Sequence, residues 1–421
     1  MNAIIIFNSI ISLLFTLCYA YQVFFVVVGL FGKRRKFTAT KQHRYGFVIS
    51  ARNEQDVIGG LIESIKAQDY PAELVDIYVI ADNCTDHTAK LAASAGAIVY
   101  ERTDEEKIGK GYALDWFFEA INDKLCADEY DGFFVVDADN VLDSGFIREM
   151  NKVFSNGYKI VTSYRNSKNY GQNWLTAGYS LWFLREARYL NNARMQLGTS
   201  CAISGTGFLV SAEILRRNGG WIHHLLTEDL EFTAESILQG EKIGYCADAA
   251  LYDEQPTKFG QSYTQRMRWA KGFYQVFMKY GKSLIKGIFK GSFSCYDILM
   301  TLMPAMLLTL VSVAVNIIVI PMGIINNMSE MLGVFKFLGK TFMGFYTMFF
   351  AMGLITTITE WKKIYCSSVK KILYLFTFPL FMMTYIPISV IALFKKVQWE
   401  PIKHSVSKSV DDICNKDTAN K

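Results

Sequence analysis

The chain has 421 residues, of which 51% are hydrophobic and 20% are charged, and its formal net charge is +5. The low share of charged residues argues against an entirely soluble enzyme, since soluble domains carry about 25%. The modest positive charge indicates lysines and arginines facing anionic lipid and not nucleic acid, and the lack of a CxxC pair among eight cysteines argues against a zinc site or a disulfide framework.

The first predicted element is a membrane-spanning helix within residues 1–32. Residues Ile4 to Leu30 are almost wholly apolar and long enough to cross a bilayer. The basic run from Lys33 to Lys36 follows at once, so the positive-inside rule places this end in the cytoplasm and the N-terminus outside. A signal peptide is the competing interpretation, disfavoured because the charges follow the apolar run and no small-residue cleavage site comes after it.

A cytosolic α/β domain is predicted over residues 45–270, where short apolar runs alternate with segments of helical spacing. The expected strands are Gly46–Ser50, Asp76–Ala81, Ala97–Tyr100 and Phe133–Val136. The expected helices are Glu54–Lys66, Thr88–Ala95 and Gly111–Asn122. This alternation predicts a mostly parallel sheet, in which ligands bind outside the carboxyl ends of the strands.

Polar side chains follow the first two predicted strands. Arg52, Asn53 and Glu54 end the first strand, where an amide or a carboxylate can hold the base or ribose of a nucleotide. Asn53 could equally cap the following helix. Asp82 ends the second strand and can accept hydrogen bonds from a nucleoside, whereas Asp86 is as compatible with a helix cap.

Two further motifs bring charge to the same edge of the predicted sheet. Lys110 lies between two glycines and suits a diphosphate, although the spacing is not that of a P-loop and a solvated loop is the alternative. Asp137 and Asp139 follow an apolar strand, so both carboxylates can face one cation. Mg²⁺ and Mn²⁺ prefer such oxygen ligands together with substrate phosphates; a surface turn is the alternative.

Two motifs before the membrane part indicate group transfer. Glu228 and Asp229 open a predicted helix, and Asp229 is the candidate general base that would deprotonate an acceptor hydroxyl, with helix capping as the alternative. Gln265, Arg268 and Trp269 form a QxxRW run. Arg268 can clamp a phosphate, and Trp269 can stack on a sugar ring.

An amphipathic interface helix is predicted over residues 271–293. Four lysines share one of its faces, which suits the headgroup layer of a membrane, and an ordinary surface helix is the alternative. These lysines are Lys279, Lys282, Lys286 and Lys290.

A C-terminal membrane region is predicted over residues 298–394. Its three apolar stretches are interrupted by prolines, which fits either bent helices that line a channel or a plain bundle. The stretches are Ile298–Ile325, Thr341–Ile358 and Ile372–Phe394. Three full crossings would leave the basic tail 395–421 outside, although Trp399 and His404 look cytosolic. We therefore expect one re-entrant or interfacial segment and a cytosolic tail.

The motifs from Asp82 to Trp269 together resemble glycosyltransferase family 2, in the processive branch of cellulose, mixed-linkage glucan, hyaluronan, chitin and poly-N-acetylglucosamine synthases. The resemblance covers residues 45–271 well and the membrane region in layout only. It implies a GT-A fold, a UDP-sugar donor, a divalent cation (Mg²⁺ or Mn²⁺) and inversion to β-linkages. Asp82 takes the nucleotide-binding position, Asp137 and Asp139 the metal-binding pair, and Asp229 the catalytic base.

The resemblance also assigns the remaining candidate residues. Gln265, Arg268 and Trp269 take the acceptor and diphosphate positions, and Ser204 and Gly205 fall in a loop near the acceptor. Trp399 and His404 loosely match a tail that closes over the donor. The nucleotide-binding set is Arg52, Asn53, Glu54, Asp82, Lys110 and Asp137.

We therefore expect a multi-pass enzyme of the plasma membrane with a cytoplasmic catalytic domain, which polymerises UDP-glucose into a β-glucan and exports it. UDP-N-acetylglucosamine is the alternative donor, and a lipid carrier that receives a single sugar is the alternative acceptor. A transporter or scaffold with an inactive domain is disfavoured by the intact Asp137, Asp139 and Asp229. The expected partners are the donor, the growing polysaccharide, the bilayer and, because only one span precedes the domain, an export partner or a second copy.

Overall fold

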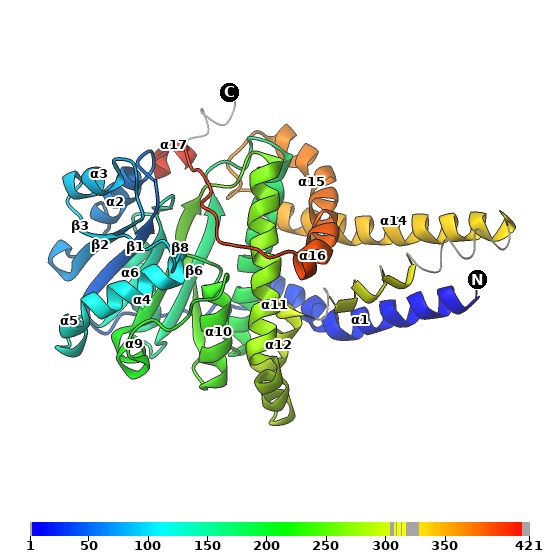
Figure 1. The fold of residues 1–421 in the computed structure, drawn as a ribbon, viewed down its shortest axis with the longest axis horizontal. Helices are drawn as coiled ribbons and strands as arrows, with labels where there is room; N and C mark the ends of the chain where they lie inside the picture. The colour runs from blue at the N-terminus through cyan, green and yellow to red at the C-terminus, as the bar shows by residue number, and fades with distance from the viewer. Residues whose placement is uncertain (1, 304–306, 309, 313, 317–327, 415–421) are drawn as a thin grey trace.

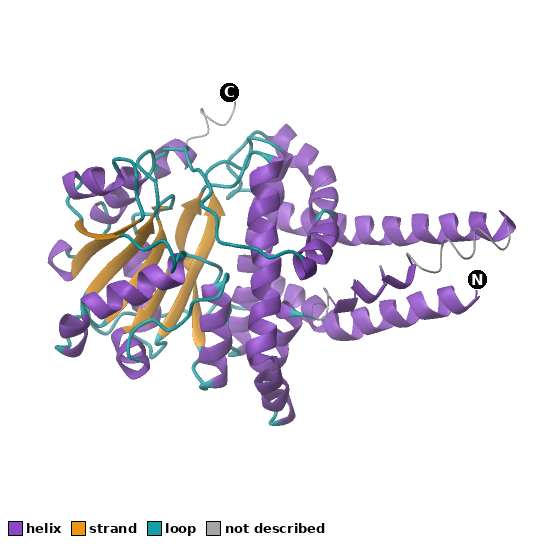
Figure 2. Ribbon diagram, viewed as in Figure 1, coloured by secondary structure: helices purple, strands orange, loops and turns teal. Residues whose placement is uncertain are grey.

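The structure, a computed structural model, describes the whole chain except residues 1, 304–306, 309, 313, 317–327 and 415–421. A sheet domain lies at one end, and two long helices extend from it at the other (Figure 1). Helices cover both faces of the sheet (Figure 2). The predicted fold class, a mostly parallel α/β domain joined to apolar helices, is confirmed.

The sheet has eight strands in the order β3-β2-β1-β4-β7-β6-β8-β5. Strands β1 to β4 pair in parallel, as do β6 and β8, while β7 runs antiparallel to β4 and β6, and β5 runs antiparallel to β8. The four predicted strands coincide with β1 to β4. The strands are β1 (Tyr45–Ala51), β2 (Val75–Asp82), β3 (Ile98–Arg102), β4 (Gly132–Asp137), β5 (Val141–Leu142), β6 (Ile160–Ser167), β7 (Phe208–Ser211) and β8 (Ile243–Asp253).

The helices of the sheet domain follow the predicted spacing, with one late start. The first helix begins at Ile58 and not at Glu54. Residues 55–57 form a turn, and this segment is tied to the start of α3 by the backbone N–H of Glu54, which donates to Thr88 Oγ1, and by that of Gln55, which donates to Asp86. The helices are α2 (Ile58–Lys66), η1 (Ala72–Leu74), α3 (Thr88–Ser94), α4 (Lys110–Ala120), α5 (Asn122–Cys126), α6 (Phe146–Phe154), α7 (Trp174–Arg185), η2 (Glu186–Asn191), α8 (Asn192–Leu197), α9 (Ala212–Asn218) and α10 (Glu228–Leu238).

The QxxRW run and the basic segment after it belong to one helix, α11 (Phe259–Phe289), which is 31 residues long. The separate interface helix predicted over residues 271–293 is therefore the second half of α11. Gly272 does not end the helix; it lets α11 approach Thr227, whose side-chain atoms would lie 2.5 Å from a Cβ at this position. The chain turns only at Gly291, where φ is +85°, and continues into α12 (Phe293–Leu302).

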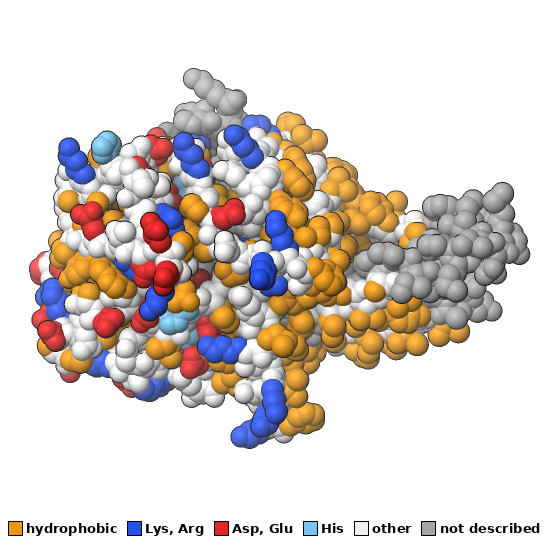
Figure 3. Space-filling model, viewed as in Figure 1, with side chains coloured by type: hydrophobic (Ala, Val, Ile, Leu, Met, Phe, Trp, Pro, Cys, Tyr) orange, Lys and Arg blue, Asp and Glu red, His pale blue; other side chains and the backbone are white. Residues whose placement is uncertain are grey.

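Three segments of the described chain are long and apolar enough to cross a membrane: Ile6–Phe31, Leu338–Thr359 and Ser368–Phe394. They belong to α1 (Asn2–Phe31), to α14 (Met328–Thr359), and to α15 (Ser368–Met383) together with α16 (Tyr385–Phe394). Half of the predicted stretch Ile298–Ile325 lies outside the described residues. In Figure 3, hydrophobic side chains cover the extension formed by α1 and α14, and charged side chains gather on the sheet domain.

Helices α15 and α16 run crosswise to α14, at the boundary between the sheet domain and the extension (Figure 1). The loop before α15 is tied to β6, because Asn166 Nδ2 donates to the Lys363 carbonyl at 2.9 Å. The end of α16 is tied to α11, because Lys271 Nζ donates to the Ala392 carbonyl at 3.1 Å. Both ends of this segment therefore lie against the sheet domain.

Helix α1 is joined to the sheet domain by buried polar contacts. Arg194 on α8 forms a bidentate pair with Asp297 on α12 (2.6 and 3.0 Å), and Tyr21 on α1 donates to the same carboxylate at 2.8 Å. Arg185 donates to Gln22 Oε1 at 2.6 Å. Burying these polar groups without partners would cost free energy. They therefore favour one position of α1 against the domain, in which each of them is paired.

Candidate active site

The predicted diphosphate lysine and the first aspartate of the DxD pair contact each other at the carboxyl end of β4. Lys110 Nζ lies 2.5 Å from Asp137 Oδ1, donates to the Gly205 carbonyl at 2.8 Å, and lies 4.0 Å from Glu228 Oε1. The backbone N–H of Asp137 donates to Thr206 Oγ1 at 2.8 Å. Four motifs that are far apart in the sequence thus meet around one ammonium group.

The second aspartate of the pair, Asp139, is buried. Its carboxylate accepts hydrogen bonds from the Glu254 backbone N–H (2.8 Å) and from Asn140 Nδ2 (3.2 Å). Burial acts to raise the pKa of Asp139, but the nearby positive charges of His404 and Lys168 outweigh it and lower the pKa below the ordinary value. Asp139 is therefore held as a carboxylate.

The donor set of the site suits a divalent cation that also binds substrate oxygens. Asp137 and Asp139 offer carboxylate oxygens, the ligand type that Mg²⁺ and Mn²⁺ prefer. Among the described residues, no group of three or more His, Cys, Asp or Glu side chains could hold a metal ion by itself. A cation bound between these two aspartates would thus complete its coordination with water or with the diphosphate of a donor.

The candidate base Asp229 lies at the start of α10 and faces the loop of residues 204–207. Its Oδ2 accepts a hydrogen bond from the Gly205 backbone N–H at 2.7 Å. Burial raises the pKa of Asp229. Burial and the neighbouring Asp229 charge raise the pKa of Glu228 to about 7. Glu228 can therefore hold a proton near neutral pH, beside the Asp229 carboxyl group.

The loop that contacts Asp229 depends on its glycines. Gly205 and Gly207 have φ angles of +77° and +66°, in the left-handed region that favours glycine. A Cβ at Gly207 would also lie 1.8 Å from Leu251 Cδ2. The predicted residues Ser204 and Gly205 thus belong to a loop whose shape depends on the close approach of Gly207 to Leu251 on β8.

The candidate nucleotide residues lie beyond the ends of β1 and β2. Asp82 is buried and paired with Arg102 (2.6 Å), and burial nevertheless raises the pKa of Asp82. Asn53 has a φ of +58°, and its Oδ1 accepts from the backbone N–H of Thr85 at 2.8 Å. Asn53 is therefore not a helix cap, and this alternative is wrong. Asp86 accepts from the Thr88 N–H at 3.0 Å, but the residue that directly precedes α3 is His87, so Asp86 lies one residue before the cap position.

The QxxRW side chains lie in the first half of α11. Trp269 packs edge-on against Tyr179 and Phe183, with ring centroids 5.7 and 6.2 Å apart. Within the described part of the chain, Gln265 Oε1 and Arg268 Nε are buried without a hydrogen-bond partner. Buried polar groups are usually satisfied, so these two atoms are suited to a ligand.

The C-terminal tail crosses the site. The Trp399 ring lies 5.4 Å from the Arg52 guanidinium and 5.9 Å from that of Arg268. His404 Nδ1 lies 2.9 Å from Glu54 Oε1. Burial acts to lower the pKa of His404, but the carboxylates of Asp139 and Glu54 raise it to about 10. The tail thus contacts residues of two predicted motifs, and His404 interacts electrostatically with Asp139 of a third.

Three residues at the site were not predicted. Glu254 Oε2 accepts hydrogen bonds from the backbone N–H groups of Ser405 and Val406, at 2.9 and 2.8 Å. Lys168 is buried beside Asp139 and donates to the Val406 carbonyl at 3.4 Å. Burial lowers the pKa of Lys168. The third is Arg102, the partner of Asp82. None of the three stands in a recognisable motif; the available signal is that Arg102 ends β3, Lys168 follows β6 and Glu254 follows β8.

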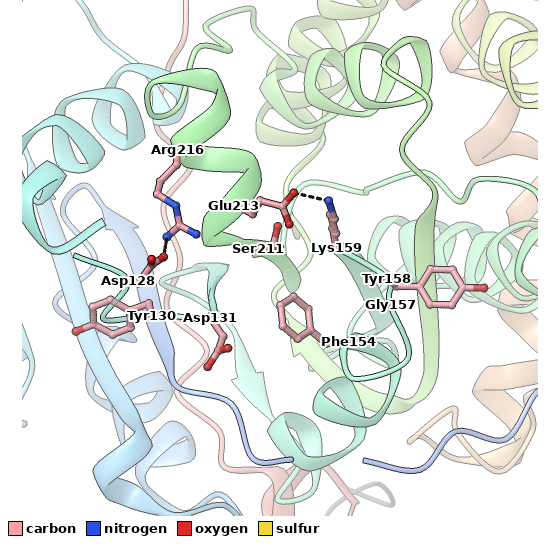
Figure 4. A pocket seen from close by; sticks show the side chains of 10 residues that line it. All are labelled: Asp128, Tyr130, Asp131, Phe154, Gly157, Tyr158, Lys159, Ser211, Glu213 and Arg216. Carbon is pink, nitrogen blue, oxygen red and sulfur yellow. Dashed lines mark hydrogen bonds and ion pairs between the residues drawn. The ribbon is translucent and has the colours of Figure 1, made fainter. Parts of the chain in front are cut away.

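A pocket of about 410 Å³ lies elsewhere, at the opposite edge of the sheet (Figure 4). Its walls include Tyr130, Phe154 and the ion pair of Lys159 with Glu213. Strands β4 and β6 begin here, whereas every candidate residue lies near the strand ends across the domain. This pocket is therefore not part of the candidate site.

Comparison with known proteins gives a consistent result. Residues 43–272 match the family described as "Glycosyltransferase like family 2". The chain is 26% identical over 234 residues to the beta-monoglucosyldiacylglycerol synthase of Synechocystis sp., covering 55% of this chain and 48% of that protein. It is 24% identical over 249 residues to the poly-beta-1,6-N-acetyl-D-glucosamine synthase of Staphylococcus epidermidis, covering 57% of each. The chain thus spans about half the length of the curated relatives it matches.

Among solved structures, the fold is similar to that of the mannosyltransferase PcManGT from Pyrobaculum calidifontis, determined in complex with GDP-Man and Mn²⁺. The TM-score is 0.55 at 13% sequence identity, and the match covers 91% of this chain and 98% of that one. At this identity the similarity is one of fold, and it includes the helices outside the sheet domain.

Proposed function

This chain belongs to the glycosyltransferase like family 2, and we propose that it transfers the sugar of a UDP-sugar, with inversion, to a hydroxyl group at the membrane surface. One observation carries the proposal: the loop of residues 204–207 contacts both Lys110, which pairs with Asp137, and the candidate base Asp229. The same loop is linked through Arg165 to the aromatic side chains where the acceptor would bind. Gly205 contacts both Lys110 and Asp229, while the Ser204 carbonyl accepts from Arg165, whose guanidinium stacks on Phe183.

The proposed reaction is a single displacement at the anomeric carbon. Asp229 takes the proton of the acceptor hydroxyl as its oxygen forms the new bond to the anomeric carbon. The bond from that carbon to the diphosphate breaks on the opposite face, and UDP leaves with the electron pair. A base that is buried and held by the Gly205 N–H keeps one orientation toward the acceptor.

The leaving diphosphate gains negative charge, which the site can offset. Lys110 is placed between Asp137 and Glu228, and the unpartnered Nε of Arg268 can donate to phosphate. Asp137 and Asp139 would hold a Mg²⁺ or Mn²⁺ ion whose charge also stabilises the diphosphate. Trp399, between Arg52 and Arg268, would cover the donor and exclude water.

For the product, we propose a β-linked polysaccharide, with UDP-glucose as donor and UDP-N-acetylglucosamine as the alternative. The aromatic wall of Trp269, Tyr179 and Phe183 supports a sugar acceptor, because aromatic rings stack on the apolar faces of sugars. The relative from Staphylococcus epidermidis, a polysaccharide synthase by name, supports the same choice. Export of the product would need a second copy or a partner protein if the spans of one chain form no channel.

A second candidate function is the transfer of one sugar to a lipid. The relative from Synechocystis is a glucosyldiacylglycerol synthase by name. Helices α15 and α16 pack against α7 and α11 at the boundary with the extension, so a lipid headgroup could reach Trp269. This reaction needs the same base and donor site and differs only in the acceptor.

We also propose that the enzyme resides in the plasma membrane, where α1 and α14 cross the bilayer and the catalytic domain is cytoplasmic. The lysines of the second half of α11, together with the exposed Phe289 (88% exposed), would lie in the headgroup layer. Helices α15 and α16 would lie at the interface without crossing it.

The test is sugar incorporation by the full chain in lipid nanodiscs. UDP-glucose, UDP-N-acetylglucosamine and UDP-glucuronate would be offered in turn with Mg²⁺ or Mn²⁺, and the product would be sized and digested with linkage-specific hydrolases. We expect high-molecular-weight polymer from one donor and a loss of about 10²-fold or more in the Asp229→Asn variant. A single sugar on lipid would support the second candidate; full activity of Asp229→Asn would contradict the assigned base.

A further inference from the structure

A carboxylate outside every predicted motif faces the back of the catalytic loop. Glu186 is the first residue of η2, a π-helical segment that follows α7. Its Oε2 lies 3.4 Å from Ser204 Oγ, which is long for a hydrogen bond between oxygens. Single π-helical turns within helices are frequent at functional sites.

Glu186 has no ion-pair partner among the described residues, although three arginines are near enough to act on its charge. Each of these arginines is engaged elsewhere: Arg165 with Asp253, Arg194 with Asp297, and Arg185 with Gln22. Burial raises the pKa of Glu186, and the arginines act against this effect. The carboxylate therefore keeps free hydrogen-bonding capacity in a polar, charged surrounding.

This carboxylate lines a small cavity of about 10 Å³. The lining residues that matter here are Arg165, Phe183, Glu186, Asn191, Ser204 and Thr206. A cavity of this size has room for about one oxygen atom, that of a water or of a hydroxyl group. A whole sugar ring does not fit in it.

Three other polar side chains around the cavity already have good hydrogen-bond partners. Thr206 Oγ1 donates to Asn140 at 2.6 Å, Asn191 Nδ2 donates to the Ala202 carbonyl at 3.0 Å, and Arg165 donates to the Ser204 carbonyl at 2.9 Å. Glu186 and the Ser204 hydroxyl, whose mutual contact is long at 3.4 Å, are the groups that lack a good partner in this part of the described chain. The cavity therefore selects an occupant that can donate a hydrogen bond to a carboxylate.

The cavity is separated from the catalytic base by one residue of the loop. Ser204 faces the cavity, and the next residue, Gly205, donates to Asp229. Phe183, which forms another wall, packs against Trp269. An acceptor stacked near Trp269 with one hydroxyl at Asp229 could thus place a second hydroxyl toward Glu186.

We propose that Glu186 binds a second hydroxyl group of the acceptor, and that the acceptor is therefore a sugar and not a lipid alcohol with a single hydroxyl. This inference rests on the proposed transferase function and specifies its substrate. A sugar carries hydroxyls beside the one that attacks, whereas diacylglycerol has only the attacking hydroxyl and would leave the cavity to water. A buried hydrogen bond to a charged group discriminates strongly between such acceptors.

The test compares two acceptors with the full chain in nanodiscs. Cellotetraose and dioleoylglycerol would be offered with UDP-glucose, and UDP release and product mass would be followed. The variants are Glu186→Gln and Ser204→Ala, with the exposed Glu119→Gln as the matched control. For Glu186→Gln we expect the KM for cellotetraose to rise about tenfold or more. The KM for UDP-glucose, the release of UDP to water and the thermal unfolding temperature should stay at the wild-type values.

The outcomes separate the two proposals. If the wild type transfers glucose to dioleoylglycerol but not to cellotetraose, the assignment of a sugar acceptor is overturned and the transferase function stands. An unchanged KM for cellotetraose in Glu186→Gln overturns the role of Glu186, as does an equal loss of UDP release to water, which would indicate a structural role. If the wild type neither transfers glucose nor releases UDP, the proposed function itself fails.

Discussion

At the scale of single residues, most of the buried acidic side chains of the site have a positively charged side chain nearby. Lys110 lies between Asp137 and Glu228, and His404 and Lys168 act on Asp139. The exception is the adjacent pair Glu228 and Asp229, two acids beside a single lysine. Like charges so close repel each other, so the pair binds a proton more readily than isolated carboxyl groups do.

This pair predicts the pH dependence of the reaction. The base must be ionised to accept a proton, and burial raises the pKa values of both Asp229 and Glu228, the latter to about 7. The rate constant kcat/KM should therefore fall as the pH drops, starting well above the pH at which a free aspartate protonates. Glu228→Gln removes one of the two like charges whose repulsion favours protonation of the pair, so the acidic limb should move to lower pH.

The measurement is kcat/KM for UDP-sugar transfer between pH 5 and pH 8 in the wild type and in Glu228→Gln. Glu119→Gln, an exposed change of the same kind, should leave the profile in place. An acidic limb that stays put, or that moves to higher pH in Glu228→Gln, would show that the two carboxyl groups do not titrate together.

At the scale of elements, helix α11 and the C-terminal tail bring the two ends of the catalytic machinery together. Helix α11 carries Arg268 toward Glu228, and the tail carries Trp399 to Arg268 and His404 to Glu54. Beyond His404 the tail packs again on the sheet domain through α17 (Val410–Cys414), where Ile413 contacts Val141 and Tyr252. The tail is therefore attached on both sides of the segment that covers the site.

Glu254 is the main polar anchor of this tail, which gives a prediction for Glu254→Ala. The change removes the acceptor of two backbone N–H groups, so closure of the tail should weaken by about 2 kcal/mol. Limited proteolysis should cut the chain between residues 395 and 409 faster, and the KM for the UDP-sugar should rise. The matched control is Glu400→Ala, an exposed glutamate of the same tail. Equal proteolysis rates in the two variants would contradict the anchoring role.

At the scale of the whole molecule, the proposed membrane topology rests on where the ends of the apolar segments lie. Both ends of the α15–α16 segment contact the sheet domain, although its composition would allow it to cross a bilayer. The tail contacts Glu54 of the candidate site, so in the proposed topology it shares the membrane side of the sheet domain. This arrangement accommodates the interfacial segment and the cytosolic tail that the basic residues predict.

Epitope tags test this topology. A tag at the C-terminus should be reached by antibody only after the membrane of intact spheroplasts is permeabilised, because the tail lies with the catalytic domain. A tag at the N-terminus should be reached without permeabilisation, because α1 is followed by the basic run from Lys33 to Lys36. A C-terminal tag reached in intact spheroplasts would mean that the α15–α16 segment crosses the bilayer.

The sequence alone determined the fold class, the strands β1 to β4, the family resemblance and the motif residues, because each rests on local patterns. Apolar runs and helical spacing reveal strands and helices, and Asp137, Asp139, Asp229 and Trp269 stand in short runs of characteristic spacing.

Only the tertiary structure decided which side chains meet. The contacts of Arg102 with Asp82, of Glu254 with the tail and of Glu186 with the catalytic loop join segments with no shared local pattern, so no periodicity or motif could reveal them. The crosswise course of α15 and α16 was likewise decided by packing, since hydropathy measures length and composition but not direction.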